Sequence, residues 1–326
     1  MKKLTIVIVV LILTGCFQIT PAQVSEKEKL LRTQPTDTIH GWKKGGVLAV
    51  NLAQTSLTNW AAGGQNSMAI NGLLSLFANF KDSLNGWDNS LDMGYGILKQ
   101  GKNARYMKTD DKIDLLTKYG RRAFGNFYYS GLFNFKTQMA PGYAYPNDSA
   151  KISDFLAPAY LLGAIGMDYK PDNYVSIFLA PVSGKITIVN NQALADEGAF
   201  GVDASTFDIA GNMLQHGKKV KTEFGGYARF IYSRNDFKSE FLKNVSFTTK
   251  IDFFSNYLKN PQNIDISWET LLVLKVNKFI SASFNTILLY DDDTMIIDKQ
   301  SDGTIVKTGP RIQFKELLGV GLSYKF

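Results

Sequence analysis

The sequence predicts an all-β fold, a transmembrane antiparallel up-and-down β-barrel of about 12 strands. Three observations support this prediction. Apolar and polar residues alternate with a period of two through most of the chain. No later segment approaches the roughly 18 consecutive apolar residues that a transmembrane helix needs. The chain ends on Leu318–Phe326, which is apolar at every even position. A barrel needs such a last strand to pair with the first, because that pairing removes the free sheet edges.

The N-terminus has the features of a secretory signal peptide. Two lysines precede an apolar run, Leu4–Leu13, which is too short to span a membrane as a helix. Thr20–Ala22 resembles an ordinary cleavage site, which predicts a signal peptide over residues 1–22. Leu13–Cys16 resembles a lipobox and leaves lipidation of Cys16 as the alternative.

Composition limits the other classes of function. Cys16 is the only cysteine, so no disulfide can form within the chain. Removal of residues 1–22 leaves 34 basic and 29 acidic residues, a net charge of +5. This excess is spread along the chain and forms no compact basic stripe, so we expect no nucleic-acid partner. We also expect no cofactor.

Residues 23–44 are polar and contain Pro35, which predicts a periplasmic lead-in to a barrel over residues 45–326. Within the barrel, segments of alternating character are separated by turn residues. The predicted strands are Gly45–Gln54, Ser67–Phe80, Trp87–Leu98, Asp110–Tyr119, Asn126–Gln138, Pro158–Tyr169, Asn173–Val182, Lys218–Ser233, Asn244–Tyr257, Ile266–Val276, Phe279–Tyr290 and a closing strand from near Ile312.

Connections between these strands alternate in length, as expected if both termini are periplasmic and the long loops face outward. The longest outer loop is Ser183–Gly217, and the shortest inner turn is Asn277-Lys278. Glu316 falls on the lipid-facing phase, which predicts a bulge there or a position outside the hydrocarbon. Aromatic residues at strand ends predict interface girdles. They are Trp42, Trp87, Tyr119, Tyr169, Tyr174 and Tyr232 at the inner end, and Tyr106, Tyr257, Trp268 and Tyr290 at the outer end.

The inward phase of the strands carries charge of both signs. These candidate pore-lining residues are Asp88, Asp92, Lys112, Asp114, Lys118, Lys221, Glu223, Arg229, Lys250, Asp252, Glu269 and Lys275. Such a lining fits either the wall of a water-filled pore or an interior braced by neighbouring opposite charges. Twelve strands lie between the filled 8-strand barrels and the open 16-strand barrels, so strand number does not decide between these interpretations.

Four segments carry a resemblance: Gly41–Gly46, Gln54–Gly64, Ala180–Lys185 and Gly198–Gly201. On the basis of these segments, the chain resembles a family of predicted outer-membrane β-barrel proteins of unknown function from Bacteroidota. The resemblance extends from about Thr38 to Phe326. The ending on Phe326 also resembles the C-terminal signature by which outer-membrane barrels are recognised during assembly. The resemblance implies a location in the outer membrane of a Gram-negative bacterium, with membrane lipid and the barrel-assembly machinery as partners. We interpret Tyr324 and Phe326 as the assembly signal.

Two further groups of residues were considered as sites. His216 is the only histidine in an outer loop and would be the base of a barrel hydrolase, with Ser205 or an acidic residue as partner. No spacing motif joins these residues, so a solvated loop histidine is favoured. The run Asp291–Asp293, with Asp298 and Asp302, lacks the spacing of a Ca²⁺ loop, and a solvated acidic loop is favoured over a metal site.

The leading functional prediction is therefore a passive pore or uptake channel for small polar solutes. The alternative is a non-transport barrel whose outer loops bind a protein, glycan or lipid partner, and a hydrolase comes third. The Ser183–Gly217 loop bears on all three, because it could enter the lumen, cover it as a lid or hold His216.

Overall fold

The structure is a computed structural model that describes residues 40–57, 65–101, 105–145, 149–172, 174–234, 236–275, 280–299 and 305–325. The predicted signal peptide, almost all of the predicted lead-in, and Phe326 lie outside these residues. So do Asn277-Lys278 and the side chains of Lys275 and Tyr324.

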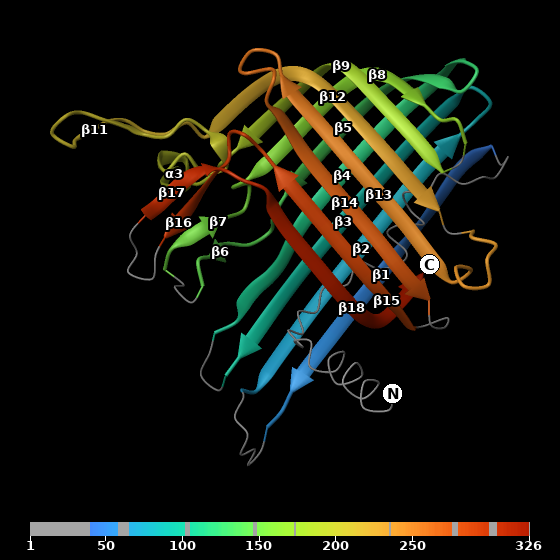
Figure 1. Ribbon diagram of the computed structural model, residues 1–326, viewed down its shortest axis with the longest axis horizontal. Coiled ribbons are helices and arrows are strands. Elements are labelled where there is room, and N and C mark those ends of the chain that lie inside the picture. The colour runs from blue at the N-terminus through green and yellow to red at the C-terminus, as the bar shows by residue number, and fades with distance from the viewer. Residues whose placement is uncertain are drawn as a thin grey trace, which may run out of the picture.

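Twelve strands form one closed antiparallel barrel, in which each strand pairs with the next barrel strand along the chain and the last pairs with the first (Figure 1). The all-β antiparallel prediction is confirmed. The barrel strands are β1 Gly41–Thr55, β2 Ser67–Lys81, β3 Asn85–Gln100, β4 Met107–Phe124, β5 Phe127–Thr137, β8 Ala159–Tyr169, β9 Val175–Ile188, β12 Val220–Arg234, β13 Val245–Asn256, β14 Ile264–Lys275, β15 Ile280–Tyr290 and β18 Gln313–Lys325.

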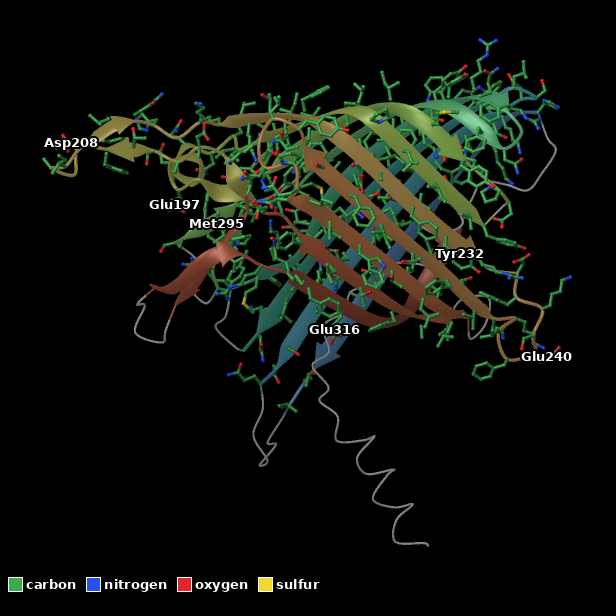
Figure 2. The ribbon with its side chains drawn as sticks, turned by 45° about the horizontal axis from the view of Figure 1, so that its top comes forward. Glu197, Asp208, Tyr232, Glu240, Met295 and Glu316 are labelled. Carbon is green, nitrogen blue, oxygen red and sulfur yellow. The ribbon has the colours of Figure 1, made fainter. Side chains whose placement is uncertain are left out.

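The four longest connections gather at one end of the barrel, which we name the loop end, and the four shortest at the other, the turn end (Figure 1). The connection from β12 to β13, at the turn end, is an exception to this pattern because it is longer than those from β3 to β4 and from β13 to β14. Figure 2 shows Glu197, Asp208 and Met295 at the loop end, and Tyr232 and Glu240 at the turn end. The loop-end connections hold small elements that the alternation does not predict. They are hairpins β6 Gly142–Tyr143 with β7 Lys151–Ser153, β10 Thr206–Phe207 with β11 Met213–Gln215 and β16 Met295–Lys299 with β17 Ile305–Pro310, the helix α3 Gln192–Asp196 and the 3-10 turn η1 Ala199–Gly201.

No helix in the described ranges has the length and apolar character needed to cross a membrane.

Several strands are longer than predicted. β1 begins at Gly41 rather than Gly45, so the last four residues of the predicted lead-in belong to the barrel. β4 continues to Phe124 because Gly125, with a φ of 51°, makes the turn to β5 in place of the predicted turn from Gly120. β9 continues to Ile188, which shortens the predicted Ser183–Gly217 loop and moves it to residues 189–219.

Aspartate side chains hold the tight turns at the turn end. Asp172 Oδ1 accepts hydrogen bonds from the backbone N–H groups of Tyr174 at 2.7 Å and Val175 at 2.9 Å. Asp82 Oδ1 does the same for Leu84 at 2.7 Å and Asn85 at 2.6 Å. Each carboxylate replaces the ladder bonds that a strand loses where the chain reverses. These turns therefore fix the register of β2 with β3 and of β8 with β9.

Apolar side chains cover the outer face of the barrel, as the alternation predicts. Leu52, Ile165 and Leu179 are exposed, and an aromatic cluster lies at the turn end. There the Trp42 ring lies 5.5 Å from Phe80 and 5.7 Å from Trp87. Such a belt is typical of residues at the boundary between headgroups and hydrocarbon.

The structure differs from two local predictions about the barrel wall. Tyr174 lines the interior near the turn end rather than the outer girdle, because it lies in the turn before β9. Glu316 produces no bulge: it pairs with Thr286 in an unbroken β15–β18 register and lies exposed on the outer face. Register shifts in the wall lie elsewhere, and one of them falls between Gly225 and Tyr227. A Cβ atom at Gly225 would lie 2.0 Å from the Ser255 carbonyl oxygen.

Candidate functional site

A cavity of about 330 Å³ occupies the barrel interior from its middle to the turn end. It is lined by inward residues of strands on opposite sides of the ring, and its turn-end rim includes Lys170, Asp172 and Tyr174. We name it the lumen cavity. Of the candidate pore-lining residues, it is lined by Asp88, Asp92, Asp114, Lys118, Arg229, Lys250 and Glu269. These residues therefore face the lumen cavity, and their role in a pore stays a prediction.

One ion cluster near the turn end joins β4 to β8 across the intervening β5. Lys118 Nζ lies 2.6 Å and Lys170 Nζ 3.3 Å from Asp168 Oδ2, and Ser176 Oγ donates to Asp168 Oδ1 at 2.7 Å. The Asp168 side chain is almost completely buried. A single carboxylate thus holds two lysines and a hydroxyl in the wall of the lumen cavity.

A second ion pair lies at the deep end of the lumen cavity. Arg229 donates to Asp252 through Nε at 2.6 Å and Nη2 at 3.1 Å, and the Tyr227 hydroxyl donates to the same carboxylate at 2.9 Å. Lys250 and Glu269 form a neighbouring pair at 3.0 Å. A bidentate guanidinium pair of this kind has fixed geometry, so it holds β12 and β13 in one register.

An apolar layer follows beyond this pair, toward the loop end. Its buried members come from five neighbouring strands, and Leu116 and Leu162 pack against it. They are Leu132, Ala164, Phe178, Ala180, Tyr227 and Phe254. The sequence analysis did not identify this layer, although Tyr227 and Phe254 share the inward phase of Arg229 and Asp252.

Charged side chains form a second network between the apolar layer and the loop end. Lys185 Nζ lies 2.7 Å from Asp265 and 3.5 Å from both Glu223 and Asp291. Lys185 lies on β9 and Asp265 on β14, and two strands separate β9 from β14 in the ring. The ion pair therefore connects parts of the wall that share no backbone pairing. Lys185 and Asp265 were not among the predicted lining residues.

The acidic run Asp291–Asp293 belongs to this network. Asp293 pairs with Lys221 at 2.5 Å and with Lys259 at 3.0 Å. Burial opposes ionisation of Asp293, but the hydrogen bonds from the two lysines lower its pKa below the ordinary value. Lysines thus pair with Asp291 and Asp293, and Asp292 accepts a hydrogen bond from the Asn263 amide at 2.5 Å. The described residues contain no group of three or more side chains arranged to hold a metal ion.

The other candidate pore-lining residues with a described side chain lie near the lumen cavity or in the loop-end network. Lys112 lies 4.0 Å from Asp114 in the wall near the lumen cavity. Lys221 and Glu223, 3.2 Å apart, belong to the loop-end network. Lys275 and the assembly-signal residues Tyr324 and Phe326 have no described side chain, so their predicted roles stay predictions.

The segment 189–219, which we name the lid, lies at the loop end. Its α3 is capped by Asn191, whose side chain accepts a hydrogen bond from Leu194 N. Leu194 and Ala195 are buried with Ala157, Val189 and Val202. A Cβ atom at Gly201 would lie 3.0 Å from the Asp293 Cβ, so the lid also contacts the turn that follows β15.

The His216 side chain is hydrogen-bonded to Asp196 within the lid and not to the hydroxyl of Ser205. Its Nδ1 lies 3.1 Å from Asp196 Oδ2, and the side chain is 67% exposed. Ser205 donates its hydroxyl to the Asp196 carbonyl oxygen at 2.8 Å and not to His216. The Gln192 side chain is the main cause of the lowered pKa of Asp196, with further hydrogen bonds from Gly217 N and His216. The histidine therefore belongs to a structural anchor of the lid.

The chain is similar to a family of unknown function in sequence and to outer-membrane barrels in structure. Residues 52–143 match the model of a family described as a protein of unknown function (DUF3078). An outer-membrane channel from Pseudomonas putida F1 is similar in structure, with 10% identity, coverage of 90% of this chain and 99% of that chain, and a TM-score of 0.39. The translocator domain of the autotransporter NalP from Neisseria meningitidis has 11% identity, coverage of 89% and 90%, and a TM-score of 0.31. No curated protein matches the chain.

Proposed function

We propose that this protein is a barrel of the bacterial outer membrane that passes small polar solutes through its lumen. The observation that carries the proposal is the lumen cavity, which is lined by charged side chains and reaches the turn end. The apolar outer face with its aromatic belt supports placement in lipid. The turn end would face the periplasm, and the lid would face the exterior.

In this proposal, the structure is a closed form of the channel. The apolar layer and the loop-end network narrow the lumen above the cavity, and the lid lies over them. Solute passage requires at least the lid and the ion pairs beneath it to move. We therefore expect rare conductance steps from the full chain, and more frequent steps once the lid is removed.

Planar-bilayer recording tests the proposal. The Val189 amide donates to the Lys219 carbonyl oxygen at 2.7 Å, so a short turn can replace residues 190–218 without moving β9 or β12. As a matched control, Asn-Gly replaces residues 207–214 and keeps the Thr206–Gln215 pair and the Asp196 anchor. The lid deletion should raise conductance and the control should not. If neither the full chain nor the lid deletion conducts, the channel proposal fails.

A second candidate function is capture of a partner by the loop end, and one observation favours it. The β10–β11 hairpin extends away from the barrel (Figure 1) and exposes apolar side chains. They are Phe207, Ile209, Met213 and Leu214. Exposed apolar patches of this kind often mark binding surfaces. In that case the control deletion would abolish partner binding and leave membrane assembly unchanged.

A further inference from the structure

The seam between β1 and β18 is paired over only part of its length. Its recorded pairs run from Val47–Lys325 to Val50–Leu322. β1 is paired with β2 along its whole length, from Gly41 to Thr55. Within the described strands, Asn51–Thr55 of β1 and Gln313–Gly321 of β18 therefore have a partner on one side only. Figure 1 shows the two strands diverging from the paired stretch toward the loop end.

The loop-end part of β18 instead contacts β4, a strand that is not its neighbour in the ring. Lys315 Nζ lies 3.5 Å from Asp110 Oδ1 on β4, although three strands separate β18 from β4 in the ring. Lys315 pairs with Ile287, which pairs with Glu269 of the lumen wall, so Lys315 lies on the inner face. Asp110 also lies inside, since a Cβ at Gly94 would lie 3.3 Å from its Oδ2. The ion pair therefore crosses the lumen.

The sequence permits a longer seam than the structure has. Continued in the same register, the pairing would join Leu52 to Val320 and end at Thr55 with Leu317. No proline interrupts either stretch, and the apolar alternation of β18 continues through Leu318 and Val320. Backbone groups left unpaired in hydrocarbon are costly, whereas an ion pair between side chains that are 44% and 33% exposed contributes little. Pairing of these backbone groups would favour completion of the wall, and the Lys315–Asp110 ion pair opposes it.

We propose that the loop-end part of β18, residues 313–321, is a gate with two positions. In the closed position, which this structure shows, Lys315 is held by Asp110 across the lumen and the seam stops at Val50–Leu322. In the open position the same segment pairs with β1 as far as Thr55, which draws Lys315 away from Asp110 and widens the lumen. This inference rests on the proposed channel function and names the element that regulates it.

Engineered cysteine pairs test the gate. All variants carry C16S, so that only the engineered thiols can cross-link. The test pair is L52C/V320C, and the control pair V50C/L322C is two residues away in the same register, where the strands are already paired. In phospholipid vesicles the control pair should cross-link at once and the test pair slowly. Adding Lys315→Met should speed cross-linking of the test pair by up to about fivefold, the upper limit for loss of an ion pair of this exposure.

Conductance provides the second measurement. The oxidised test pair should conduct more than its reduced form, reversibly with dithiothreitol, and oxidation of the control pair should change nothing. A test pair that never cross-links, a rate insensitive to Lys315→Met, or a cross-linked form that conducts no more than the reduced one would overturn the gate. If every form is silent, including the lid deletion, the channel proposal fails, while the cross-linking rates still decide whether β18 moves.

Discussion

The substitution Asp252→Ala tests whether water reaches the middle of the barrel. Arg229 and Tyr227 donate three hydrogen bonds to the Asp252 carboxylate, at 2.6, 3.1 and 2.9 Å. Arg229 is 5% and Asp252 8% exposed, so Asp252→Ala leaves a buried guanidinium without its counter-charge. In a dry site this loss destabilises a protein by about 3–5 kcal/mol. A pair surrounded by water contributes only about 0–1 kcal/mol, so the two cases differ clearly.

Urea unfolding in phospholipid vesicles, followed by tryptophan fluorescence, gives the free energy of unfolding of each variant. Asp252→Ala should lower it by the larger amount, and the double variant Arg229→Met with Asp252→Ala should recover most of the loss, because no charge is then left unpaired. The control is Asp203→Ala, which removes an exposed partner of Lys218 and should change little. A loss below about 1 kcal/mol for Asp252→Ala would refute a dry middle layer and show that water reaches this pair.

Three further outcomes follow from the wall, the lid and the closing strand. Phe253→Arg or Leu272→Arg should destabilise the barrel by about 2–4 kcal/mol in the same urea assay, and Ser281→Arg much less, because the alternation predicts that only the first two face lipid. Equal losses would show the facing assignment to be wrong. The hydrogen bonds to Asp196 that lower its pKa favour its charged form, so lid anchoring should be complete above 3.8, its ordinary pKa, and lost as pH falls through the lowered value. Hydrogen exchange of lid amides measures this loss, and Asp196→Ala should show the same fast exchange at pH 7, unless other contacts hold the lid. Deletion of Phe326 should reduce the yield in the membrane while the assembled protein keeps near-normal heat stability, and a wild-type yield would count against the assembly signal.

The period-two alternation was sufficient to predict much of the wall. It placed Arg229, Lys250 and Asp252 on the inner face because side-chain direction in a strand depends only on counting residues. The same rule also places Tyr227 and Phe254 inside. It could not show that they form a layer with Phe178 and other residues, because that layer joins side chains from five strands.

Features that depend on irregular or distant contacts were not predictable from local pattern. Ala180 and Ser183 both lie in the barrel wall as buried residues, because a register shift between them changes the phase of β9 by one residue. The Lys185–Asp265 pair depends on barrel curvature, which no single strand encodes. The lid combines a helix, a 3-10 turn and a hairpin, and its Asp196 anchor depends on contacts rather than on a motif.

The order of the strands in the ring has a consequence for how fast the chain folds. Every interface except β1–β18 joins barrel strands that are neighbours along the chain, so nearly all pairing is local in sequence. Local contacts form quickly. The closing contact joins Val47 to Lys325, so its formation costs the conformational entropy of closing a loop that contains almost the whole barrel. The entropic cost of closing a loop rises only slowly with its length, but here the short β1–β18 interface alone must offset it. A circularly permuted chain, with Lys325 joined to Gly41 by a flexible linker that spans the six residues of β1 before Val47, would make that interface local. The slow step would then move to the interface between the strands that carry the new termini.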